Sequence, residues 1–145
     1  MPSLMMTVRN LIVGAVLAIG FGGAVAAAPG DILYDCTMVQ LKKNGGWISQ
    51  KVGIIMQGEN EVKVVDAVIL HFAKEPIEGT VVRNNAKRLI VKWEVRGARG
   101  GGTSLESVDF RASIGKKTGR IQLSALASGF DFGPNGTGKC TPRTQ

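Results

Sequence analysis

Residues 87–96 read Lys-Arg-Leu-Ile-Val-Lys-Trp-Glu-Val-Arg, and this stretch decides the fold class. Leu89, Val91, Trp93 and Val95 recur at every second position, and mostly charged side chains stand between them. Because successive side chains of a strand point to opposite faces, this alternation predicts a strand with one buried face. The β-branched and aromatic residues on the apolar face also favour a strand.

The same period of two recurs along most of the chain. Residues 108–114 and 120–125 alternate clearly, and strand-forming residues are also frequent in four earlier runs, at 31–41, 47–56, 61–72 and 80–83. Gly-, Asn- and Pro-rich turns separate these runs, and they are too short for helical crossovers. We therefore predict an all-β fold, a small antiparallel meander barrel or sandwich of about seven strands.

Two segments depart from this alternation. Residues 65–72 form a short apolar run that suits either a strand or a helix. Residues 127–139 are rich in glycine and contain Pro134. This composition predicts a loop, held in place by Cys140.

Residues 1–26 have the three parts of a cleavable secretory signal peptide. Arg9 precedes an apolar core at residues 11–21, and Ala24-Val25-Ala26 fits the small-residue cleavage pattern. That core is too short to cross a bilayer, and nothing later is apolar enough to do so. We expect residues 27–145 to form a single domain in the periplasm of a bacterium or outside the cell. A retained N-terminal anchor is the alternative.

Cys36 and Cys140 are the two cysteines of the chain and lie near opposite ends of the expected domain. In an oxidising compartment they most simply form one disulfide. It would close a loop of about 105 residues and stabilise the fold by roughly 4–5 kcal/mol on the chain-entropy account. With the single histidine, His71, the cysteines make no metal-ligand spacing. We therefore expect no metal and no cofactor.

Catalytic motifs are weak throughout the chain. No serine lies in a G-x-S-x-G turn, and a nucleophile would need a base such as His71 within hydrogen-bond reach. Residues 97–104 lack the lysine of a phosphate-binding loop, and residues 131–142 lack most ligands of a calcium loop. We predict a protein without catalytic residues. An enzyme with an unrecognised site is a second alternative.

The formal net charge is +7, which becomes +6 when Arg9 is removed with the signal peptide. In an up-and-down meander alternate turns emerge at the same end, where only Glu59 and Glu61 would oppose a cluster of cations. We call this cluster the basic rim: Arg83, Lys87, Arg88, Lys116, Lys117 and Arg120.

Such a rim would attract an anionic partner: a lipid headgroup, an acidic glycan or an acidic protein. Ordinary solubility charge is the alternative interpretation. Nucleic acid is disfavoured, because export separates the chain from it and no aromatic residues interleave these charges.

Trp47 and Trp93 are candidates for lining a ligand pocket, although Trp93 falls among predicted core residues. If they line one, the protein would be a lipocalin-like carrier of a small apolar ligand. This carrier is the alternative to a binding module that uses the basic rim.

Short motifs are spread along the expected mature domain: Tyr34-Asp35-Cys36, Gly46-Trp47-Ile48, Val64-Val65-Asp66, Ile69-Leu70-His71-Phe72, Lys92-Trp93-Glu94-Val95 and Gly138-Lys139-Cys140. In these motifs the chain resembles a group of small secreted proteins from alphaproteobacteria over nearly all of the mature domain. The resemblance implies no catalytic or binding residues. The layout is also similar to that of small periplasmic β-barrel inhibitors of lysozyme, with an early and a late cysteine. However, lysozymes are commonly basic and a chain of charge +6 would repel one.

Overall fold

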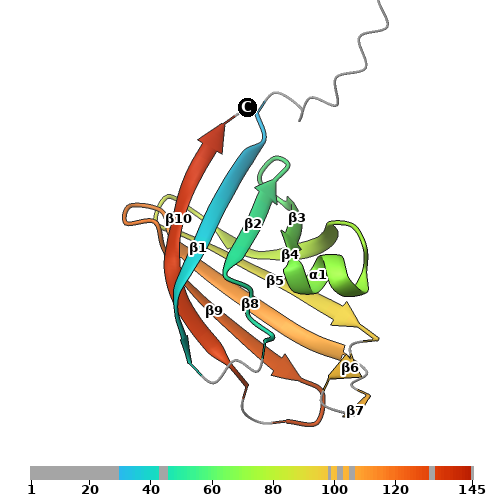
Figure 1. The fold of residues 1–145 in the computed structure, drawn as a ribbon. Coiled ribbons are helices and arrows are strands. Elements are labelled where there is room, and N and C mark those ends of the chain that lie inside the picture. Colours follow the sequence, from blue (N-terminus) through green and yellow to red (C-terminus); the bar gives the residue numbers. More distant parts are fainter. Residues whose placement is uncertain are drawn as a thin grey trace, which may run out of the picture.

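The computed structural model describes residues 30–42, 46–97, 99–100, 103–104, 107–130 and 133–144. In this part of the chain, eight antiparallel strands close a barrel (Figure 1). The predicted signal peptide, residues 1–26, lies outside the described residues. No helix within these ranges is long and apolar enough to cross a bilayer.

The elements follow one another as a meander with two additions, a short helix and a two-stranded hairpin. In chain order they are β1 (Ile32–Lys42), β2 (Lys51–Met56), β3 (Glu61–Asp66), α1 (Ala67–Phe72), β4 (Ile77–Asn84), β5 (Arg88–Arg96), β6 (Arg99–Gly100), β7 (Thr103–Ser104), β8 (Ser107–Gly115), β9 (Arg120–Ala127) and β10 (Asn135–Thr144).

Each barrel strand pairs with the next one along the chain, and β5 pairs with β8 across the β6–β7 hairpin. The last strand, β10, pairs with both β9 and β1 and so closes the circle. The predicted all-β meander is confirmed, and it is a barrel rather than a sandwich. It has eight strands rather than the seven expected.

The alternation in β5 is confirmed except at Ile90, which was expected on the outer face and is buried as well. Leu89, Val91, Trp93 and Val95 are buried, while the charged residues between the last three are exposed. Trp93 lies on Phe110 of β8 with ring centroids 5.4 Å apart and nearly parallel planes. Burying side chains of this size contributes about 1.5–3 kcal/mol each, so these strands carry much of the core.

The seam between β1 and β10 corrects the prediction of a loop at residues 127–139, because the chain re-enters the sheet at Asn135. Cys36 and Cys140 are directly opposite each other there, 3.9 Å apart at Cα, and form the predicted disulfide. Gly138 lies two residues before Cys140 on β10, and a Cβ atom added there would overlap the carbonyl of Thr37 on β1. Glycine at this position therefore lets the backbones of β1 and β10 approach each other. Because glycine has no apolar side chain, it also removes the alternation by which a strand is recognised in sequence.

Helix α1 resolves the ambiguous segment at residues 65–72: the strand ends at Asp66 and a helix follows. Asp66 is the N-cap, and its Oδ1 accepts a hydrogen bond of 2.7 Å from the backbone N–H of Ile69. This satisfies one of the free N–H groups of the first turn. Ile69 is fully buried and anchors the helix on the barrel.

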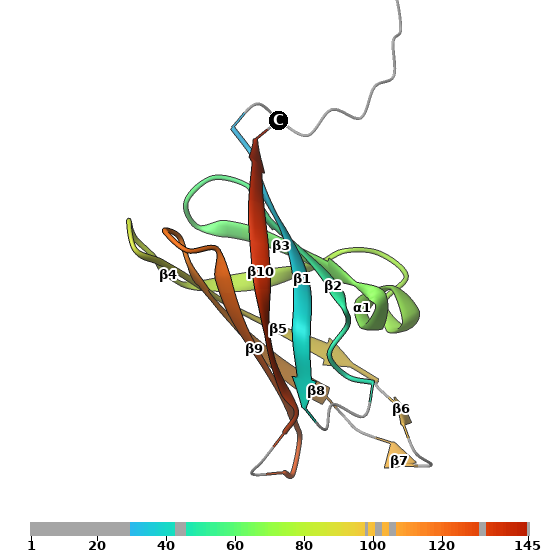
Figure 2. The same ribbon diagram turned by 60° about the vertical axis from the view of Figure 1, so that its left-hand side comes forward.

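The meander gives the barrel two unlike ends. The turns β2–β3, β4–β5 and β8–β9 emerge at one end, which we call the basic end. The segment before β2, helix α1, the β6–β7 hairpin and the β9–β10 connection lie at the other. Figure 2 shows the β4–β5 and β8–β9 turns close together on the left and α1 and the hairpin on the right.

Candidate functional site

The three turns of the basic end are joined by hydrogen bonds. Lys116 Nζ in the β8–β9 turn donates to Asn84 Oδ1 at the end of β4, at 2.5 Å. Asn84 Nδ2 in turn donates to the carbonyl of Glu59 in the β2–β3 turn, at 3.1 Å. The backbone N–H of Lys116 also donates to the carbonyl of Lys87, at 2.9 Å. These bonds hold neighbouring turns in fixed positions.

Local sequence explains the shape of the two basic turns. Asn85 Oδ1 accepts from the backbone N–H groups of Lys87 and Arg88, at 3.0 and 2.8 Å, in the side-chain-to-backbone pattern typical of asparagine in turns. In the next hairpin Gly119 adopts a positive φ of 72° and donates to the carbonyl of Gly115. Glycine adopts this conformation without steric cost, so the chain turns sharply before β9.

The residues of the basic rim lie on these turns and on the strand ends beside them. All of them are exposed except Lys116, which is half-buried. Arg88 extends along the outer face of the barrel, where its guanidinium donates to Ser113 Oγ at 2.7 Å. The meander therefore gathers cations from two hairpins at one end of the molecule.

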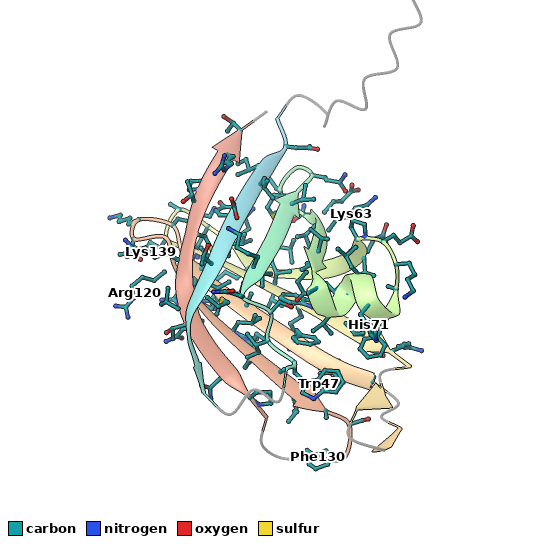
Figure 3. All side chains as sticks on the ribbon, in the orientation of Figure 1. Trp47, Lys63, His71, Arg120, Phe130 and Lys139 are labelled. Carbon is teal, nitrogen blue, oxygen red and sulfur yellow. A yellow bond between two sulfur atoms is a disulfide. The ribbon has the colours of Figure 1, made fainter. Side chains whose placement is uncertain are left out.

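Lys139 belongs to the same cluster and was missed by the sequence analysis. It stands on β10 directly opposite Arg120 on β9, and both side chains are exposed (Figure 3). Like charges directly opposite each other in an antiparallel pair are destabilising. Lys139 could be found only with the register of β10, and this segment was predicted to be a loop.

Few carboxylates balance these cations. Within the described ranges the ion pairs are Lys51 with Asp35, Arg143 with Asp35 and Arg96 with Glu94. None of them involves the basic rim or Lys139. The basic end therefore carries a local excess of positive charge that can attract anions over about a Debye length.

A cleft of about 1140 Å³ lies at the opposite end of the barrel, between α1 and the segment before β2. Trp47 and Phe72 face each other across part of it with ring centroids 6.2 Å apart and planes inclined by 14°. Of the two predicted pocket tryptophans, Trp47 therefore lines a cleft. Trp93 is buried in the core against Phe110 and does not line it.

Asp66 and His71 also line this cleft. The Asp66 carboxyl is buried, and this burial raises its pKa, while hydrogen bonds led by that from Ile69 N–H act against the rise. In the described part of the chain, its Oδ2 and the Nε1 of Trp93 are buried without a hydrogen-bond partner. His71 is exposed, and its ring packs edge-on against Phe72 at 4.7 Å.

Asp66 and His71 lie at opposite ends of α1, because Asp66 is its N-cap and His71 is in its last turn. Among the described residues, no group of three or more His, Cys, Asp or Glu side chains is arranged to hold a metal ion.

No family model, no curated protein and no solved structure matches this chain.

Proposed function

We propose that this chain is an exported, non-catalytic binding protein that takes up an anionic ligand at its basic end. The ligand would be a component of the bacterial envelope or an acidic partner protein. In this proposal residues 1–26 direct export to the periplasm or beyond, and the disulfide stabilises the mature domain there. The resemblance to small secreted alphaproteobacterial proteins agrees with this location.

The observation that carries the proposal is the pairing of Arg120 with Lys139 across β9 and β10. Two cations in direct opposition cost stability, and no carboxylate of the described chain forms an ion pair with either. A bound anion would relieve this repulsion and gain attraction from the nearby rim residues. Because these side chains are exposed, each contact is worth about 0.2–1 kcal/mol, so affinity requires several of them together.

The test is calorimetric titration with inorganic tripolyphosphate as a simple anionic probe. We expect the Arg120→Gln/Lys139→Gln double variant to bind about tenfold more weakly than the unmodified protein. The matched control is Lys63→Gln/Lys74→Gln, which changes net charge equally. Figure 3 shows Lys63 well away from Arg120 and Lys139. Binding of the unmodified protein should also weaken between about 0.05 M and about 0.5 M salt, as screening increases.

Equal weakening in the two double variants would show that net charge alone attracts the probe, and absence of binding in the unmodified protein would overturn the proposal.

A carrier of a small ligand is a second candidate, favoured by the cleft beside Trp47. Its aromatic lining suits an apolar body, and the unpartnered Asp66 Oδ2 suits a hydroxyl or amine on that body. Native mass spectrometry of protein from the export fraction tests this idea. A bound small molecule that is lost in Trp47→Ala supports a carrier, whereas a bare mass contradicts it.

A further inference from the structure

The outer face of β8, β9 and β10 continues from the basic end as rows of polar side chains. The first row is Arg120 and Lys139. Ser113 and Gln122 stand opposite each other in the second row, which Thr137 completes. The third row joins Arg111, Ser124 and Asn135 in the same way.

The second and third rows enclose a groove of about 280 Å³, which we call the polar trough. It is hollow because short serine side chains alternate with longer ones across the strands. Ser124 lies between Arg111 and Asn135, and Ser113 lies beside Gln122. The polar lining of the trough is Arg111, Ser113, Gln122, Ser124, Asn135 and Thr137.

Cations stand at both ends of the trough. Arg120 and Lys139 border it on the side of the basic end, where Arg88 also reaches Ser113 Oγ. Arg111 lies in the far row. With a strand rise of about 3.3 Å per residue, the row of Arg120 and that of Ser124 are ~13 Å apart. Lys92 on β5 stands directly opposite Arg111, so the far end of the trough is also cationic, and Asp109 in the next row offsets part of this charge.

Amide and hydroxyl side chains between two cationic ends define the chemistry of a ligand. Hydroxyl groups of a sugar both donate and accept hydrogen bonds, as serine and glutamine side chains do. Carboxylate or sulfate groups would bind the cations at the ends. Among the described residues that line the trough none is aromatic, so this lining offers no platform for stacking nucleic-acid bases.

We infer that the polar trough is the binding site of an acidic oligosaccharide. One anionic group lies between Arg120 and Lys139, the sugar hydroxyls contact Gln122 and Ser124, and a second anionic group approaches Arg111. The span of the trough suits a short oligosaccharide rather than a single ring. This inference rests on the proposed function and specifies its ligand.

The experiment separates the trough from the basic end by two variants. Ser124→Ile fills the trough without changing charge, and a β-branched residue is well suited to an exposed strand position. Thr80→Ile, on the exposed side of β4, is its matched control. The Arg120→Gln/Lys139→Gln variant removes charge beside the trough. The probes are tetragalacturonate, a sulfated heparin tetrasaccharide, inorganic tripolyphosphate, oligothymidylate and phosphatidylglycerol vesicles.

We expect at least one of the two tetrasaccharides to bind more tightly than the other probes. Ser124→Ile should weaken its binding about tenfold and leave tripolyphosphate within about twofold, because only the sugar occupies the trough. The charge variant should weaken both probes, and Thr80→Ile neither.

If tripolyphosphate binds through the basic end but Ser124→Ile leaves the tetrasaccharides unaffected, the trough inference is overturned and the proposed function stands. Tighter binding of oligothymidylate or of the vesicles also overturns it. If no probe binds, the proposed function fails with it.

Discussion

Arg120 and Lys139 face each other directly across β9 and β10, two cations at a position where a sheet is stabilised by opposite charges. The closure of the barrel through β10 creates this pair, since both residues would be separate surface charges if residues 127–139 formed a loop. The pair is therefore a place where stability and binding are expected to oppose each other.

Lys139→Glu should make the protein more stable and a poorer anion binder. The new carboxylate would stand opposite Arg120, replacing repulsion by attraction worth about 0.5–1 kcal/mol. Urea unfolding followed by tryptophan fluorescence measures the gain, and titration with tripolyphosphate measures the loss. Lys139→Gln should fall between the two in stability. A Lys139→Glu protein that is less stable than Lys139→Gln would mean that the two side chains do not interact.

Reduction of the Cys36–Cys140 disulfide should lower the free energy of unfolding by up to about 4–5 kcal/mol. The bond joins residues 104 positions apart, so reducing it frees a long loop in the unfolded chain. Unfolding the same protein with and without reductant gives the difference without altering any side chain. A loss below about 1 kcal/mol would show that β1 and β10 hold the seam without it.

Gly138→Ala should destabilise the seam by about 1–3 kcal/mol or more, because its methyl group would overlap the Thr37 carbonyl on β1. Gly53→Ala is a useful comparison. The nearest atom to its added Cβ would be a side-chain methyl of Val65, at 3.0 Å, and side chains yield more readily than backbone. The urea midpoints of the two variants test this order, and a smaller loss for Gly138→Ala would contradict the tight approach of β1 and β10.

Asp66→Asn should change how stability depends on pH. Burial raises the pKa of Asp66, so its contribution to stability is fully present below the pKa of the unfolded chain, about 3.9. This contribution is lost as pH rises through the pKa of Asp66 in the folded protein. Asparagine preserves an N-cap and does not ionise. The variant should therefore gain stability relative to the unmodified protein between about pH 4 and pH 7.

Asp35→Asn should change the pH dependence of stability in the opposite direction. A hydrogen bond from Lys51 lowers the pKa of Asp35, so its contribution is present above the unfolded pKa and is lost as pH falls through the folded value. This variant should lose stability at neutral pH and approach the unmodified protein in acid. Urea unfolding at several pH values checks both variants, and curves parallel to that of the unmodified protein would contradict both pKa shifts.

The strands with strict alternation could be predicted from sequence because each buries one face against the core. Leu89, Val91 and Trp93 mark β5 in this way. The strand β10 could not be predicted, because its inward positions include Gly136 and Gly138, which leave no apolar pattern. Gly138 serves a close approach of β10 to β1, and that requirement depends on the closed barrel rather than on local sequence.

The candidate site, like the fold, could be predicted only in part. Charge and turn spacing predicted the basic rim, and its residues lie on the β4–β5 and β8–β9 turns and on the strand ends beside them. Lys139 and the polar trough depend on the register between β9 and β10, which hydrophobic periodicity does not supply. The same holds for the cleft, since α1 arises where Asp66 caps a short apolar run that suits two structures.

The seam also orders events in time if the chain is exported as proposed. A chain that leaves the cytoplasm N-terminus first presents β1 and the Cys36 thiol to the outside long before Cys140, 104 residues later, arrives. Through that interval one edge of β1 has no neighbour, and an unpaired edge can join a strand of another chain. The faithful production of this protein would then depend on how quickly translocation finishes, and any pause in secretion would favour dimers linked through Cys36.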